Sequence, residues 1–380
     1  MKSSQSKTQL PLAALIVLLS SMALLPWATR AAQPQQQQQE TPAPPPHDMN
    51  HMQHNHGGFM QEGMHHAVAK GIKLEQQVDS ATHTITLREG PLTLPANTNH
   101  MMMPQPPDVF WIIPLDGFLR AYTPRLVDAN GNAVPGIVLH HTAFWNTDRS
   151  DFLCPNKEEH IFGAGSELTN WIEIPGYGYR VQKGDRIRIE TMVHNPTPKS
   201  YDKVYLEVKI PYADPQSATD KASTKSVYPT WMDVQSCGNS GYNLKAGKNE
   251  NTGTVTVKYN GVLLGVGGHM HDYAKQIVLE DTTRKETVAT LDANVDAKGQ
   301  LLSMPVVTFF DRGGYKFAAG DELRITATYD NTTGKPLPNG AMGIVVGYFL
   351  PVDDTAMSAL RRKPKLAPHQ VAATTSSRDQ

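Results

Sequence analysis

The sequence predicts an all-β protein made of two antiparallel, jelly-roll-like β-sandwich domains in tandem. Three observations favour this fold class. Charged residues make up only 19% of the 380 residues, whereas Gly (29) and Pro (28) are plentiful, as is typical of turn-rich β proteins. From about residue 72, short alternating strands are separated by turn signals at intervals of roughly 8–12 residues. The third observation is an internal repeat of one strand-and-turn motif.

The repeated motif occurs once in each half of the chain. Lys183–Thr191 (KGDRIRIET) matches Ala319–Ala327 (AGDELRITA), and each copy is followed by an Asn-x-Thr triplet, at Asn195 and at Asn331. In both copies a tight Gly-Asp turn precedes a long alternating strand. Two separated copies of one motif favour two domains of like architecture. Chance similarity between two Gly-Asp turns is the alternative.

The strand patterns give the domain boundaries. We predict one sandwich over residues 72–212 and a second over residues 226–355. A polar stretch without periodicity, residues 213–225, reads as the linker between them. The tail, residues 356–380, begins with a short helical pattern and then shows none.

The first 71 residues have a different composition. Residues 1–31 read as a secretory signal with Lys2 and Lys7 ahead of an apolar run, although a retained membrane anchor is the alternative. Residues 32–71 are Gln- and Pro-rich and then His- and Met-rich, so they cannot bury a core and are expected to be disordered. Within them, the imidazole and thioether donors of residues 47–66 suit copper capture; a solvated tail without a selected role is the alternative.

Net charge and cysteine content indicate which classes of partner and which cellular compartment to expect. The formal net charge of −1 implies no strong attraction to nucleic acid, so we expect no nucleic-acid partner. With the signal removed, we expect an exported protein, periplasmic or extracellular, without stable membrane insertion. Cys154 and Cys237 permit one disulfide in an oxidising compartment, or two unpaired thiols; the sequence leaves this choice and the oligomeric state open.

A His-x-His segment lies between two strand-like runs in the second block. Side chains at positions i and i+2 of a strand share a face, so His269 and His271 should stand side by side while Met270 points the other way. Two imidazoles on one strand can bind a single metal ion. Two half-exposed histidines with ordinary hydrogen bonds are the alternative.

Further copper-type donors lie in comparable strands. The first block has the adjacent pair His140 and His141, and His194 at the end of the repeated strand. Neighbours on a regular strand face opposite ways, so His140 and His141 can share an ion only near a strand end or a bulge; otherwise one is core and one is surface. In the second block Met342 lies within the closing strand Asn339–Phe349, where it is either a core residue or a thioether ligand that favours Cu(I).

Four segments in this order resemble the copper type II, ascorbate-dependent monooxygenases, the family of peptidylglycine α-hydroxylating monooxygenase and dopamine β-hydroxylase. The similarity covers roughly residues 90–352. The segments resemble, in turn, the approach to the family's His-His pair, the strand of its third histidine, its His-x-His segment and its Met-bearing strand: Val109–Ile112 with Ala133–His141, Arg186–Pro196, Gly268–Leu279 and Ala341–Pro351.

The resemblance implies two copper ions on facing sides of a solvent-filled cleft. One would be an electron-transfer site and the other the catalytic site that binds dioxygen. Ascorbate or an equivalent reductant would supply electrons, and a C–H bond of a small-molecule substrate would be hydroxylated with O2. Carried over to this sequence, the electron-transfer ligands are His140, His141 and His194, and the ligands of the catalytic site are His269, His271 and Met342.

The chain also departs from the family. It has at most one disulfide, and four positions after Met342 stands the apolar Val346, so the residues that hold a peptide carboxylate are not identifiable and the substrate stays open. The alternative function is a non-catalytic copper-binding or buffering protein on the same two-domain fold, which the His- and Met-rich residues 47–66 favour. A binding module without metal is a third reading.

Overall fold

A computed structural model describes residues 68–98, 102–165, 169, 171, 173–214, 216–217, 220 and 223–362. The expected signal, nearly all of the segment 32–71 and the tail beyond residue 362 lie outside these residues. Strands dominate the described part of the chain, and almost all of their pairings are antiparallel, so the predicted all-β sandwich class is confirmed. No helix within these ranges is long and apolar enough to cross a membrane.

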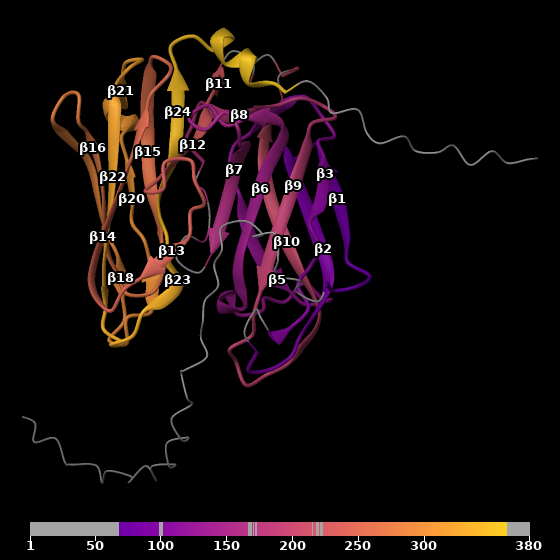
Figure 1. The fold of residues 1–380 in the computed structure, drawn as a ribbon. Helices are drawn as coiled ribbons and strands as arrows, with labels where there is room; N and C mark the ends of the chain where they lie inside the picture. The colour runs from indigo at the N-terminus through magenta and orange to yellow at the C-terminus, as the bar shows by residue number, and fades with distance from the viewer. Residues whose placement is uncertain are drawn as a thin grey trace, which may run out of the picture. The chain divides into compact units, whose positions relative to one another are not determined.

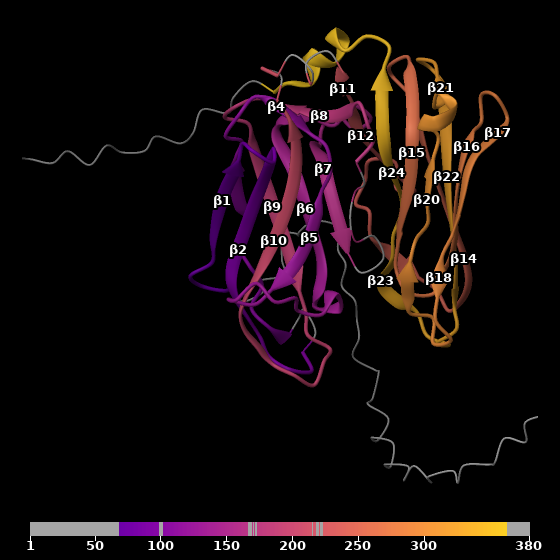
Figure 2. The same ribbon diagram turned by 180° about the vertical axis from the view of Figure 1, so that it is seen from behind.

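The first sandwich stacks a seven-stranded sheet on a four-stranded one. Its strands are β1 (Lys73–Asp79), β2 (Thr84–Leu94), β3 (Val109–Ile112), β4 (Gly117–Leu119), β5 (Thr123–Val127), β6 (Leu139–Ser150), β7 (Glu158–Gly165), β8 (Tyr177–Val181), β9 (Arg186–Val193), β10 (Tyr201–Ala213) and β11 (Lys225–Ser226). The larger sheet has the order β1-β2-β10-β4-β8-β11, with β5 also on β10, and the smaller has the order β3-β9-β6-β7. Figure 2 shows β1, β2, β10 and β5 of the larger sheet side by side.

Alternation along the strands explains why these two sheets stack. On β9 the apolar Ile187 and Ile189 are fully buried, whereas Arg186 and Arg188, which alternate with them, are half-buried on the other face. On β2, Ile85 and Leu87 alternate with Arg88 in the same way. The apolar faces of both sheets join in one core cluster, which is what a sandwich requires.

The second sandwich repeats this plan. Its strands are β12 (Tyr228–Asp233), β13 (Tyr242–Leu244), β14 (Gly247–Thr256), β15 (Gly261–Met270), β16 (Ala274–Asp281), β17 (Glu286–Asp292), β18 (Asn294–Val295), β19 (Leu301–Ser303), β20 (Val306–Thr308), β21 (Tyr315–Phe317), β22 (Glu322–Asn331), β23 (Leu337–Ala341) and β24 (Gly343–Pro351). The sheet β12-β24-β15-β20, with β21 on β15, faces the sheet β14-β22-β16-β17. Figure 1 shows this sandwich nearly edge-on, with β14, β16 and β22 in one layer and β15 and β24 in the other.

The sequence repeat extends to the hydrogen bonds. The Asn195 amide donates to the backbone carbonyl four residues on (2.8 Å) and accepts from the N–H and hydroxyl of the threonine two residues on (3.1 and 2.7 Å). Asn331 makes the same three bonds, at 2.7, 3.1 and 2.6 Å. The two copies therefore share a local structure, and chance similarity of two turns does not account for them.

β24 is buried on both faces. Ile344 and Val346 belong to the core cluster that holds the first sandwich, whereas Val345 and Phe349 belong to the cluster of the second. A strand covered on both sides needs a nearly continuous apolar run, which the sequence GIVVGYFLP provides. Met342, which directly precedes β24, shares the first cluster and is 8% exposed.

Covalent and ionic contacts also join the two sandwiches. Cys154, after β6, forms a disulfide with Cys237, after β12, so the choice that the sequence left open is settled in favour of a bridge. At the C-terminal end, the predicted short helix is a 3-10 helix, η5 (Thr355–Leu360), and the next residue, Arg361, pairs with Asp185 through two bonds of 2.8 and 3.1 Å. The expected linker, residues 213–225, leads into β11, and β11 still pairs with β8 of the first sandwich.

A buried carboxyl in the first sandwich makes its stability depend on pH. Glu89 accepts a 2.7 Å hydrogen bond from the Thr191 hydroxyl. Burial raises the pKa of Glu89 from 4.5 to about 7, although the Thr191 bond lowers it. Because the folded state binds this proton more tightly than the unfolded state, the free energy of unfolding falls as pH rises from 4.5 to about 7.

We predict that Glu89→Gln removes this pH dependence. An uncharged amide keeps the shape and the bond from Thr191. The free energy of unfolding of Glu89→Gln minus that of wild type should therefore be larger at pH 8 than at pH 4. The rise in pKa from 4.5 to about 7 corresponds to a difference on the order of 3 kcal/mol. Denaturant unfolding at both pH values measures it, with Glu75→Gln, exposed on β1, as the control. Parallel pH profiles for wild type and Glu89→Gln would contradict it.

Candidate metal centres

The three histidines of the first block lie together in the structure. The ring centroid of His140 is 5.3 Å from that of His141 and 4.9 Å from that of His194, with interplanar angles of 47° and 43°. All three side chains are half-buried. The grouping expected from the sequence is therefore present at the level of side-chain proximity.

A β-bulge allows the adjacent pair to share a side. On β6, Leu139 pairs with Val193 and His141 pairs with Met192, so two steps on β6 match one step on β9. The extra residue is His140, at the beginning of the strand. A bulge turns one side chain out of the regular alternation. Two neighbouring histidines on a strand need such a bulge, or a strand end, to bind the same ion.

Backbone contacts orient His194. Its Nε2 lies 2.5 Å from the carbonyl oxygen of Ile137, and its N–H donates to the carbonyl of Val138 at 3.1 Å. A proton on Nε2, donated to this carbonyl, leaves Nδ1 as the unprotonated nitrogen. Metal-binding histidines commonly donate the proton of their other ring nitrogen in this way.

Gln105 supports the same strand end and was missed by the sequence reasoning. Its side-chain oxygen accepts from the Val193 N–H at 2.9 Å, and its amide donates to the Val193 carbonyl at 3.1 Å. Gln105 is 7% exposed. It thus holds the backbone directly before His194.

A carboxylate beside this group was also missed. Glu190 Oε1 lies 3.8 Å from His141 Nε2, and its other oxygen accepts from Arg188 at 3.3 Å. Burial acts to raise the pKa of Glu190, but the neighbouring His141 and Arg188 hold it below its usual value. Alternation along β9 places Glu190 on the same face as His194, which was the available sequence signal.

The second group combines β15 with the start of β24. The His269 and His271 ring centroids are 5.5 Å apart, whereas Met270 is buried in the second core, as the alternation predicted. His269 pairs with Ile344 and Met270 with Gly343, where the ladder ends, and His271 and Met342 are the next residues along the chain on each side. Alternation places His269 and His271 on one face of β15, and Met342 packs in the same core cluster as Ile344, the ladder partner of His269.

Tyr329, on β22 of the opposite sheet, connects the two chain segments of this group. Its hydroxyl accepts from the His271 N–H at 3.0 Å and from the Met342 N–H at 3.2 Å, and it donates to the Met342 carbonyl. Burial raises the pKa of Tyr329 well above 10, so the hydroxyl keeps its proton. The sequence reasoning did not single out this residue.

The donor sets fit copper in chemistry, and their rings are close together. A metal–nitrogen bond is about 2 Å long, so the centroids of two imidazoles on one ion lie roughly 5 Å apart. The three centroid distances of 4.9, 5.3 and 5.5 Å are near this value. Even so, in the part of the chain that the structure describes, no three His, Cys, Asp or Glu side chains are placed to hold a metal ion.

Aromatic packing joins the sandwiches beside these groups. The ring of His160, on β7, lies 4.1 Å from the Trp231 ring on β12 and 4.3 Å from the Trp145 ring on β6. Burial lowers the pKa of His160 well below 6.5, and the charges of His269 and Arg188 lower it further. Along β12 and β7 the two sandwiches therefore meet through packed side chains.

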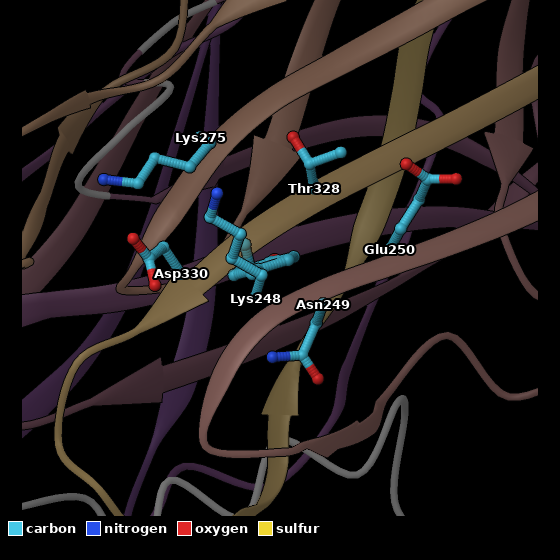
Figure 3. A pocket seen from close by; sticks show the side chains of 7 residues that line it. Lys248, Asn249, Glu250, Lys275, Thr328 and Asp330 are labelled. Carbon is cyan, nitrogen blue, oxygen red and sulfur yellow. The ribbon is translucent and has the colours of Figure 1, made fainter.

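A shallow surface pocket of about 320 Å³ lies elsewhere on the second sandwich. Thr328 and Asp330 flank Tyr329 on β22 and face the pocket, whereas the Tyr329 hydroxyl points into the core. The pocket is thus on the outer face of the sheet and does not adjoin the histidines. Figure 3 shows its lining, which includes Lys248, Asn249, Glu250, Lys275, Thr328 and Asp330.

Two fungal proteins are similar to this chain in sequence. The first, from Cochliobolus lunatus, is named "probable copper-dependent oxygenase clz3" and is 26% identical over 242 residues, 58% of this chain and 74% of that protein. The second, from a Phoma species, is named "probable copper-dependent oxygenase M1" and is 26% identical over 240 residues, 58% of this chain and 59% of that protein. No protein-family model matches the chain.

Solved structures give only weak likenesses. PNGase F, a glycosylasparaginase from Flavobacterium meningosepticum, is 9% identical with a TM-score of 0.35, covering 70% of this chain and 96% of that one. The major capsid protein P2 of bacteriophage PM2 is 10% identical with a TM-score of 0.30, covering 69% and 97%. Both scores are too low to establish a shared fold.

We predict that His194→Ala lowers the copper content from two ions to one. Its group lies in the first sandwich, whereas His269 and His271 lie in the second, so one loss should leave the other ion in place. Metal analysis of folded, dialysed protein measures this, with His83→Ala, outside both groups, as the control. Loss of both ions, or of neither, would contradict two separate centres.

Proposed function

We propose that this protein is a copper-dependent oxygenase with one copper ion in each sandwich. The observation that supports this most strongly is the closeness of the histidine rings in each sandwich, among residues that follow the order found in copper monooxygenases. The names of the two fungal relatives point to the same chemistry. The chain spans 74% of the length of the first relative and 59% of the second. The activity is therefore a proposal that rests on this chain's own residues as well as on those names.

The two groups suit different roles. His140, His141 and His194 would hold an ion that receives electrons from ascorbate or an equivalent small reductant. His269, His271 and Met342 would hold the second ion, because a neutral thioether favours Cu(I) and three protein ligands leave a position open. Copper in such sites changes oxidation state and activates dioxygen towards a C–H bond.

The proposed reaction is the hydroxylation of a small-molecule substrate. One oxygen atom of O2 enters the C–H bond to give an alcohol, and the other leaves as water with two protons. The reductant supplies the two electrons that this balance requires. The protein's part is to hold donors and exclude water: Met342 is only 8% exposed, and Ile344 opposite His269 is fully buried.

Neighbouring groups would influence the charge, the histidine tautomer and the preferred copper oxidation state at these sites. Glu190 is ionised and lies beside His141, so it offsets positive charge that a metal ion would bring to the first group. The carbonyl of Ile137 sets the tautomer of His194. In the second group, the apolar neighbours of Met342 disfavour the more highly charged Cu(II).

We further propose that the protein is exported. Residues 1–31 have the pattern of a secretory signal. A Cys154–Cys237 disulfide persists in oxidising compartments such as the periplasm or the extracellular medium and is rare in the cytosol.

Met342→His tests the proposed catalytic ligand. Histidine also binds copper, so the metal content should stay at two ions, but a harder nitrogen donor favours Cu(II). Ascorbate-driven oxygen consumption should therefore fall by roughly tenfold or more, a loss typical of changes beside metal ligands. Met304→His, at another buried methionine of the second sandwich, controls for a buried polar ring. Unchanged oxygen consumption in folded Met342→His would contradict the role of Met342.

A copper buffer is the second candidate, and the His- and Met-rich residues 47–66 favour it. Removing residues 1–67 separates the two functions by copper count. An oxygenase should keep two tightly bound ions without these residues. Copper that is lost with them would support the buffer and contradict the oxygenase.

A further inference from the structure

The hydroxyl group of Tyr329 contacts both chain segments of the second donor group, and the role given to it below rests on the proposed function. Tyr329 is 2% exposed and lies on β22, across the core from His271 and Met342. Burying a hydroxyl is unfavourable unless hydrogen bonds compensate for lost water. All three bonds described above run to the backbone of the two proposed ligands, and none runs to the strands that flank β22.

These bonds stand where the sheet's own ladder stops. The pairing of β15 with β24 ends at Met270 and Gly343. His271 and Met342 are the next residues on each side, beyond the last ladder pair. The Tyr329 hydroxyl thus engages the N–H of His271 and both the N–H and carbonyl of Met342, which the ladder does not pair.

The internal repeat shows that the fold itself does not require this tyrosine. In the first copy of the motif the same position is Val193, whose apolar side chain is fully buried in the first core. An apolar residue is therefore sufficient at this inward-facing position. The hydroxyl is a specific feature of the second copy, where the two segments of the Met-containing group meet.

We propose that Tyr329 is a positioning residue that holds His271 and Met342 in register so that both reach one copper ion. Without the hydroxyl, the ends of β15 and β24 lose the bonds that keep them side by side beyond the ladder. The thioether then leaves the ligand set more readily than the imidazoles, because it is the weaker donor. The first group, supported by Gln105 rather than Tyr329, is unaffected.

Tyr329→Phe tests this proposal, because it removes one oxygen atom and keeps the ring. In the copper-loaded, reduced chain without residues 1–67, whose methionines are themselves copper donors, X-ray absorption should show a sulfur neighbour of copper in wild type and none in Tyr329→Phe. Both proteins should contain copper at the first group. Tyr242→Phe, a partly buried tyrosine whose ring is 6.3 Å from that of Tyr329, is the matched control and should keep the sulfur signal.

The outcomes separate this proposal from the proposed function. A sulfur neighbour retained in Tyr329→Phe overturns the role of Tyr329 and leaves Met342 as a ligand. No sulfur neighbour in wild type overturns the assignment of Met342, and the proposal with it. A measurement on metal-free wild type is independent of any variant: the amide protons of His271 and Met342 should be protected from exchange, and exchange at the rate of unprotected amides would overturn the proposal.

Discussion

The double burial of β24 is the constraint on which the rest of the structure depends. One face packs in the core of the second sandwich through Val345 and Phe349, and the other packs with the first sandwich through Ile344 and Val346. A strand held on both faces cannot shift its register without exposing apolar side chains on both sides. It therefore keeps Ile344, two residues after Met342, in register opposite His269.

The two donor groups use one scaffold in different ways. The repeated Gly-Asp strand ends both times in the same asparagine network. In the first copy it presents His194 to a bulged His140–His141 pair, with Gln105 holding the strand end. In the second copy it carries Tyr329, and the donors come from β15 and the start of β24. A shared backbone plan with different inward-facing residues thus yields two chemically distinct groups.

The sequence could predict whatever depends on local periodicity. Alternation fixed the common face of His269 and His271, and the geometry of neighbouring residues predicted a bulge or strand end at His140. The disulfide, the packed Trp231–His160 contact and the hydrogen bonds of Tyr329 depend on which strands meet in space. No short stretch of a single sequence shows which distant strands lie next to each other. The cleft that the resemblance implies stays a prediction, although aromatic side chains fill the contact between β7 and β12.

The most direct test of the two-centre account is the location of copper in crystals of the copper-loaded protein. Anomalous diffraction measured on both sides of the copper absorption edge identifies the ion without assumptions about its ligands. The account predicts two copper peaks, one within bonding distance, about 2 Å, of nitrogens from His140, His141 and His194, and one beside His269, His271 and Met342. Copper peaks only at other residues, or no peak at either group in fully loaded protein, would contradict it.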